Sequence, residues 1–230
     1  GTYSFGEHDE NNLFFAGHNN FYYLGNQSYG CNIDAKDCAD EEYTESPLRA
    51  TGNDCFGSPG RNDWYDTVKL NYGIDYRTGN RQFSPVPNTW VKMLKILQYW
   101  ASQGIDGFRL DVADELPDEF IEKVRRALKQ CGKNKLLIGE VWEDAVTKIS
   151  YNKRRSYLLG KGLDSTMNYP FRVAVLDFIK NGNGEKFCES IFSIYENYPK
   201  EALDNAWNFI STHDTPRGIT YLMGENPESS

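Results

Sequence analysis

Short apolar segments alternate with amphipathic helical segments from residue 88 onward, and this alternation constrains the fold more than any other feature of the chain. The predicted strands are 105–110, 136–139, 163–167 and 207–211, and the predicted helices are 88–104, 117–132, 144–149, 171–180 and 186–198. Segment 136–139 is apolar throughout and 105–110 is mostly apolar, which is typical of strands buried on both faces, whereas 163–167 gives a weaker signal. The pattern predicts an α/β fold with a parallel sheet covered by helices.

The first 88 residues show no sustained helical or strand period and are rich in Gly, Asn, Asp and Tyr. Turn-favouring pairs recur at 25–26, 52–53 and 59–60. Compact proteins contain so long an irregular stretch chiefly as a functional loop packed by its own aromatic side chains, or as an excursion from a regular scaffold. We therefore expect an irregular loop domain at 1–88 and a regular α/β region at 89–230.

The charge and the aromatic content narrow the class of partner. A formal net charge of −8 argues against nucleic acid, because phosphate binding needs clustered basic residues and the tight basic cluster is confined to 153–155. No apolar stretch approaches the roughly 18 residues of a membrane span, which predicts a soluble chain without a membrane partner. The 15 Tyr, 13 Phe and 5 Trp exceed what a core needs, so some should line a wet surface that binds a neutral ligand.

The five cysteines form no C-x-x-C pair, which argues against a zinc or redox motif. We interpret them as free thiols, with Cys131 and Cys188 on apolar helical faces; a loop disulfide between Cys31 and Cys38 is the alternative. Reduced thiols favour the cytoplasm slightly over secretion, but the compartment stays open. The chain begins at Gly1 without Met or a signal peptide, so we expect the natural start to lie elsewhere.

Polar residues follow the predicted strands at their carboxyl ends, where parallel α/β folds place their sites. Arg109 and Asp111 share one face of the first strand because strand side chains alternate. A neighbouring guanidinium lowers the pKa of a carboxyl group, which suits a nucleophile or an electrostatic stabiliser. A structural ion pair is the alternative interpretation.

A second carboxyl group, Glu140, comes directly after the apolar run of the second strand. Burial raises the pKa of a carboxyl group, so this residue could act as a general acid near neutral pH. Trp142 offers a stacking face beside it. The alternatives are a plain ion pair between Glu140 and Arg109, and an ordinary core position for Trp142.

The segment after the last predicted strand contains His213, Asp214 and Arg217, and is denser in polar groups than a loop requires. The alternative for Asp214 is a helix cap before Thr215 and Pro216. Two carboxylates and a third acidic group on successive strand ends have the layout of glycoside hydrolysis.

At this point the chain resembles the α-amylase family, glycoside hydrolase family thirteen. Three segments resemble the second, third and fourth signatures of that family, in the family's order: GIDGFRLD at 104–111, GEVW at 139–142 and THDT at 212–215. The segment LDSTMNYPFR at 163–172 resembles the neopullulanase and cyclomaltodextrinase branch, and VKLNY at 68–72 is also similar to the family. The resemblance covers about residues 64 to 224, and more loosely identifies the first 60 as the irregular domain inserted after the third barrel strand.

The resemblance implies a partial (β/α)8 TIM barrel, about strands 4 to 7, with the N-terminal loop domain inserted after barrel strand 3. A complete barrel takes about 250 residues, whereas this chain has 88 irregular residues and only four strand segments. Such a half-barrel exposes apolar strand edges, which predicts a homodimer or a swapped assembly.

The resemblance also implies a retaining glycoside hydrolase acting on α-1,4-linked glucans, such as malto-oligosaccharides, cyclodextrins, pullulan or starch. It implies that Asp111 is the nucleophile of a covalent β-glycosyl-enzyme, that Glu140 is the general acid and then the base, and that Asp214 binds sugar hydroxyls. The further implied contacts are Arg109, which orients Asp111, and the substrate-binding candidates His213, Trp142 and Arg217.

The chain departs from the family pattern in two places. The sequence VADE at 112–115 lacks the Lys-His pair of many starch-liquefying α-amylases, which favours the branch that degrades oligosaccharides or cyclodextrins. The first signature, Asp-x-x-x-Asn-His, is absent. Transglycosylation through the same intermediate stays open, as does a glycan-binding chain without catalysis. No cofactor is implied, and calcium is unsupported because the spacing of Asp34, Asp37 and Asp40 fits no calcium loop.

Overall fold

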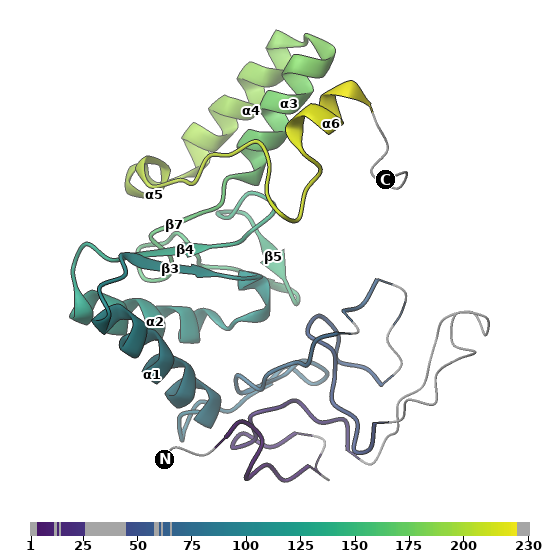
Figure 1. The fold of residues 1–230 in the computed structure, drawn as a ribbon, viewed down its shortest axis with the longest axis vertical. Helices are drawn as coiled ribbons and strands as arrows, with labels where there is room; N and C mark the ends of the chain where they lie inside the picture. The colour runs from purple at the N-terminus through teal and green to yellow at the C-terminus, as the bar shows by residue number, and fades with distance from the viewer. Residues whose placement is uncertain are drawn as a thin grey trace. The chain divides into compact units, whose positions relative to one another are not determined.

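The computed structural model describes residues 4–224 except 12, 14, 26–44, 58, 59, 61 and 65 (Figure 1). The chain divides into two compact units, Gly1–Tyr99 and Trp100–Ser230. The boundary falls inside helix α1 (Asn88–Ser102). The functional division at residue 88 stays a prediction.

The first unit is irregular over most of its described length. It contains one antiparallel pair of short strands, β1 (Ile74–Asp75) and β2 (Asn80–Arg81). One of its buried hydrophobic clusters consists of Tyr22, Leu24, Leu48 and Ala50. The Tyr22 hydroxyl donates a 2.5 Å hydrogen bond to Asp75, and burial, followed by this bond, raises the pKa of Tyr22. The rings of Phe15 and Tyr76 pack against Tyr22, so a cluster of aliphatic and aromatic side chains holds together a segment with little regular structure.

A parallel sheet organises the second unit. Strands β3 (Gly107–Leu110), β4 (Leu136–Gly139) and β7 (Ser165–Thr166) lie in the order β3-β4-β7, and Trp207 forms a single parallel bridge with Met167 beside them. The predicted parallel sheet is therefore confirmed. Gly139 at the end of β4 lies so close to the Leu163 side chain that a Cβ atom there would clash with it.

Helices cover the sheet and connect its strands (Figure 1). Helix α2 (Asp118–Cys131) connects β3 to β4 and buries four apolar side chains along one face: Phe120, Ile121, Val124 and Leu128. Helices α3 (Tyr169–Asn181) and α4 (Gly184–Asn197) pack against each other, and each begins after an asparagine whose side chain accepts a backbone N–H of the first turn. The short helices are η1 (Ala113–Glu115), α5 (Lys200–Asp204) and α6 (Gly218–Met223).

The predicted helix at 144–149 is wrong. The segment forms a turn and then the antiparallel hairpin of β5 (Ile149–Ser150) and β6 (Lys153–Arg154). The Asp144 carboxylate accepts the backbone N–H groups of Val146 at 2.8 Å and Thr147 at 3.2 Å, a local arrangement that competes with a helix. Tyr151 and Asn152 then form the hairpin turn with φ angles of 49° and 58°.

The predicted strand at 207–211 is also wrong beyond Trp207, because residues 208–211 join no ladder. Pro117 is the residue before α2 rather than its first helical position. Cys131 and Cys188 are exposed, so their prediction on apolar faces is wrong, although both are free thiols, as is Cys55. The remaining cysteines lie outside the described residues. None of the described helices is both long and apolar enough to cross a membrane.

Candidate active site

The carboxyl ends of β3 and β4 bring Arg109, Asp111 and Glu140 together. The strands pair in parallel, with Leu110 opposite Gly139, so Asp111 and Glu140 occupy the next positions along the two strands. Nη1 of Arg109 donates a 2.5 Å hydrogen bond to Oδ1 of Asp111, and Nη2 lies 3.0 Å from Oε2 of Glu140. One guanidinium therefore contacts both candidate catalytic carboxylates.

The electrostatic setting keeps Arg109 charged. Burial by itself lowers the pKa of this guanidinium, but the hydrogen bond to Asp111 and the negative charges of Glu140 and Asp111 outweigh burial and leave the pKa raised. A permanent positive charge is thus held between two acidic side chains, and it reduces the repulsion between them.

The two carboxylates differ sharply in exposure. The Asp111 side chain is 73% exposed, whereas that of Glu140 is 3% exposed. Glu140 accepts hydrogen bonds from the Val112 backbone N–H at 2.9 Å, the Trp142 indole at 3.1 Å and the Tyr169 hydroxyl at 3.3 Å. This geometry fits both interpretations of Glu140, the general acid and the ion-pair partner of Arg109, because the residue is buried and also pairs with Arg109. Asp111 is free to meet a ligand, and Glu140 is held in place.

The backbone turns abruptly after Asp111. Val112 has φ 37° and ψ 66°, a left-handed conformation that is a true outlier for a β-branched residue. Its N–H donates to the Glu140 side chain, and the N–H of Ala113 donates to the Glu140 carbonyl at 3.1 Å. Such a conformation costs on the order of 1–3 kcal/mol and persists only where the surroundings enforce it. Glu140 therefore also fixes the backbone beside Asp111.

Trp142 lies at the surface, with 48% of the residue exposed, so the alternative of a core position is wrong. Its ring stacks on Tyr169 with centroids 4.2 Å apart and an interplanar angle of 15°. Phe209 packs edge-on against the same tyrosine at 4.8 Å. Sequence reasoning missed Tyr169, because a tyrosine at the start of a helix gives no signal that separates a site residue from a core residue.

Met167 is a second residue that sequence reasoning missed. It is buried, and its Sδ atom accepts the Nε–H of Arg109 at a donor–acceptor distance of 3.0 Å. The three nitrogens of Arg109 therefore face Met167, Asp111 and Glu140 in turn. A thioether is a weak acceptor, so the contact orients the guanidinium without competing for its charge.

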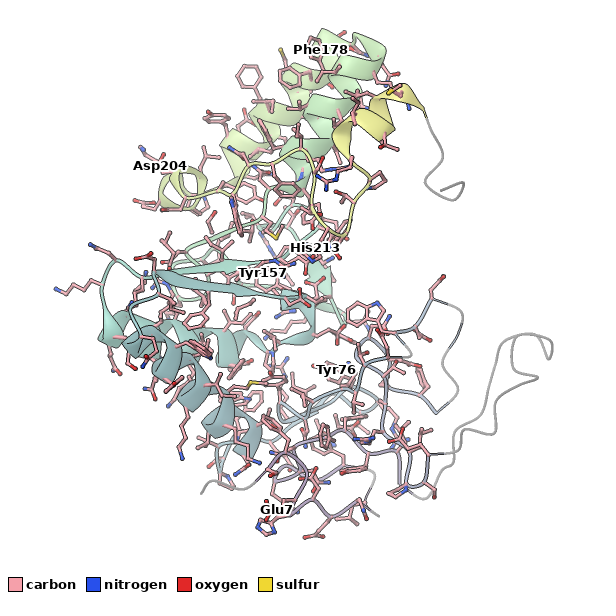
Figure 2. All side chains as sticks on the ribbon, in the orientation of Figure 1. Glu7, Tyr76, Tyr157, Phe178, Asp204 and His213 are labelled. Atoms are coloured by element: carbon pink, nitrogen blue, oxygen red, sulfur yellow. The ribbon has the colours of Figure 1, made fainter. Side chains whose placement is uncertain are left out.

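His213 and Asp214 lie in the loop before α6, and Figure 2 shows His213 at the turn of this loop on the side that faces the sheet. Nε2 of His213 is 3.1 Å from Oδ2 of Asp214, and both residues are exposed. Burial raises the pKa of Tyr169, and the charges of Glu140 and Asp214 add to this effect, although a hydrogen bond with Thr212 opposes it. Tyr169 therefore contacts Glu140 on one side and Thr212 of this loop on the other.

The structure does not bring every candidate into the cluster. Asp214 is not a helix cap, because α6 begins at Gly218 with Arg217 in the cap position. Arg217 is exposed, and within the described part of the chain no hydrogen bond or ion pair joins it to the cluster. No group of three or more acidic, His or Cys side chains that could hold a metal ion occurs among the described residues, and Asp34, Asp37 and Asp40 lie outside them.

Comparisons with known proteins match the part of the chain that contains these residues. The family described as "Alpha amylase, catalytic domain" matches residues 84–229. Neopullulanase 2 from Thermoactinomyces vulgaris is 35% identical over 140 residues, which is 60% of this chain and 22% of that protein. A cyclomaltodextrinase from a Bacillus species is 35% identical over 142 residues, which is 60% of this chain and 24% of that protein. The chain thus spans about a quarter of the length of these curated relatives.

Solved structures show the same likeness. The ligand-free cyclic alpha-maltosyl-(1→6)-maltose hydrolase from Arthrobacter globiformis matches with a TM-score of 0.55 and 26% identity, over 68% of this chain and 34% of that one. A cyclomaltodextrinase structure matches with a TM-score of 0.53 and 32% identity, over 68% and 26% of the two chains. These matches confirm the predicted α/β fold as part of a (β/α)8 barrel. The chain therefore belongs to the α-amylase family and contains part of its catalytic domain.

Proposed function

We propose that the protein to which this chain belongs is a retaining glycoside hydrolase acting on α-1,4-linked glucans. The observation that carries the proposal is the shared contact of Arg109 with an exposed carboxylate, Asp111, and a buried one, Glu140. Retaining enzymes need two carboxyl groups about 5–5.5 Å apart. Neighbouring strands lie roughly 4.8 Å apart, and Asp111 and Glu140 follow paired residues of β3 and β4. This separation suits a retaining enzyme better than an inverting one, which needs a wider spacing between the two carboxyl groups.

In the first step, Asp111 attacks the anomeric carbon while protonated Glu140 gives its proton to the glycosidic oxygen. The bond from the anomeric carbon to that oxygen breaks, the leaving sugar carries away the proton, and a covalent β-glycosyl-enzyme forms. In the second step, ionised Glu140 takes a proton from water, and that water displaces Asp111 from the anomeric carbon. Both carboxyl groups return to their starting states.

The surrounding residues have supporting roles in this mechanism. Arg109 orients Asp111, because its guanidinium donates a hydrogen bond to that carboxylate directly. His213 and Asp214 are expected to bind sugar hydroxyls in the distorted transition state. The exposed part of Trp142 offers apolar surface to a glucose ring, and its indole N–H also positions Glu140. Arg217 stays a candidate for contact with a longer substrate.

The substrates we propose are malto-oligosaccharides, cyclodextrins, pullulan or starch. Support comes from relatives named neopullulanase and cyclomaltodextrinase, and from the sequence VADE at 112–115. We expect the full-length protein to hydrolyse β-cyclodextrin faster than soluble starch, with pullulan as the third substrate, and to release the α-anomer first. Reducing-sugar assays and proton NMR of the fresh product measure both. Absence of turnover on all three, or release of the β-anomer, would contradict the proposal, and products longer than the substrate would indicate transglycosylation.

We also propose that the 230-residue chain by itself associates with a second copy. Within the described residues β3 pairs only with β4, so its other edge offers free backbone groups. A cavity of about 340 Å³ opens between Phe108, Ile138 and Trp207. Light scattering after size-exclusion chromatography should give about twice the 26.4 kDa of one chain. A monomer at micromolar concentration would contradict this expectation.

A further inference from the structure

The loop that contains His213 and Asp214 is held at both ends by one side chain, Arg172 of α3. Nε of Arg172 donates to the carbonyl of Ile210 at 3.1 Å, and Nη2 donates to the carbonyl of Pro216 at 3.3 Å. These carbonyls flank residues 211–215, which form no helix or strand. Two separate points of an irregular segment are therefore fixed to a regular helix.

The burial of Arg172 makes this contact unusual. The residue is 9% exposed, and within the described residues no carboxylate forms an ion pair with it. Its other neighbour is the Tyr221 ring, whose centroid lies 6.0 Å from the guanidinium carbon. Buried arginines are normally paired with an acid. Here the planar guanidinium donates hydrogen bonds to two main-chain carbonyls, and the single ammonium group of a lysine could not reproduce that geometry.

The loop has an internal framework that Arg172 connects to the rest of the unit. The N–H of Thr212 donates to Oγ1 of Thr215 at 2.9 Å, and the N–H of Asp214 donates to Oγ1 of Thr212 at 3.2 Å. These bonds define the shape of the turn but do not place it relative to the sheet. Arg172, together with the Tyr169–Thr212 hydrogen bond, provides that placement, because α3 begins at Tyr169, the residue that contacts Glu140.

The start of α3 holds the preceding segment in the same way. The backbone N–H of Asn168 donates to the Trp207 carbonyl at 3.0 Å, and its side chain donates to Asn208 at 2.9 Å. Asn168 and Arg172 lie one helical turn apart, so one end of α3 holds residues 207, 208, 210 and 216.

We propose that Arg172 is a positioning residue that sets the His213–Asp214 pair relative to Glu140. The inference rests on the proposed function where it assigns His213 and Asp214 to sugar binding. Loss of the clamp leaves the internal bonds of the turn and the Tyr169–Thr212 hydrogen bond in place, but it releases the carbonyls of Ile210 and Pro216, so the turn shifts relative to α3. A displacement of about 1 Å in a substrate-positioning group can cost on the order of 10²-fold in rate.

The first test reads the loop directly and needs no catalysis. The chain has three histidines, His8, His18 and His213, so imidazole signals in a ¹³C-labelled 230-residue chain can be assigned with single His→Gln variants. In Arg172→Lys we expect the His213 signal to shift or broaden while the His8 and His18 signals stay unchanged. The exposed Arg126 of α2 gives the matched control, Arg126→Lys, which should alter none of them.

The second test measures turnover in the full-length protein. Arg172→Lys should lower kcat/KM on malto-oligosaccharides by about 10²-fold, with a circular-dichroism spectrum close to wild type and a lower melting temperature, because a buried hydrogen bond is lost. If the lysine variant does not fold, Arg172→Gln provides the same comparison, because it removes the guanidinium and buries no charge. An unchanged His213 signal in a folded variant would overturn the positioning proposal. A changed His213 signal with wild-type turnover would support the clamp and overturn the assignment of His213 and Asp214 to the substrate.

Discussion

We expect replacement of Asp111 by Asn to lower kcat on α-1,4-glucans by about 10⁶-fold, the order of magnitude found when the nucleophile of a covalent mechanism is removed. The amide keeps the shape of the side chain but cannot attack the anomeric carbon. Because the Asp111 side chain is 73% exposed and its carboxylate contacts only Arg109 among the described residues, the free energy of unfolding should change by no more than about 0.5 kcal/mol.

The measurement is single-turnover and steady-state hydrolysis of β-cyclodextrin by the full-length protein, together with urea unfolding. Asp106→Asn is a matched control, since Asp106 is exposed and lies just before the first residue of β3, whereas Asp111 follows the last. The control should retain wild-type kcat. Full activity in the Asp111 variant would remove the nucleophile assignment, and equal losses in both variants would indicate damage to the fold instead.

Replacing Glu140 by Gln should lower kcat by about 10²- to 10⁴-fold and also destabilise the fold. The two oxygens of Glu140 accept three hydrogen bonds and contact Arg109. In the glutamine variant an NH2 group replaces one of these oxygens, so that a donor faces other donors. Leaving a buried donor unsatisfied costs about 1–3 kcal/mol. The two variants should thus differ in stability: both lower kcat, but only the change at the buried Glu140 should also lower the free energy of unfolding.

A substrate with an activated leaving group isolates the chemical part of the Glu140 effect. A glycosyl fluoride needs little proton assistance for departure, so the Glu140→Gln variant should form the glycosyl-enzyme from it at a rate close to wild type. Glu143→Gln is the control, because its side chain is 62% exposed and pairs with Lys148 at the surface. Equal loss on the fluoride and on malto-oligosaccharides would argue against the general-acid role.

Local patterns predicted the regular elements well and the irregular ones poorly. Helices α1 to α4 and strands β3, β4 and β7 lie where the period and the flanking Gly, Pro and Asn residues indicate. The segment at 144–149 contains apolar residues that suit a helix, but the Asp144 side chain occupies the first N–H groups and a hairpin follows. Segment 207–211 contains three apolar residues, as the strand prediction requires, but within this segment only Trp207 forms a β-bridge, with Met167.

The sequence by itself determined the alternation of strands and helices, and with it the edge of the sheet at which Asp111 and Glu140 meet. Side-chain alternation and parallel pairing are local rules, so both carboxylates could be placed without coordinates. Only the tertiary structure decided that Asp111 is exposed and Glu140 buried, that Met167 accepts from Arg109, and that Arg172 holds the loop of His213. The Arg109–Met167 contact joins residues that are 58 positions apart in the sequence, and the Arg172–Pro216 contact joins residues that are 44 positions apart. No short-range period in a sequence predicts contacts over such separations.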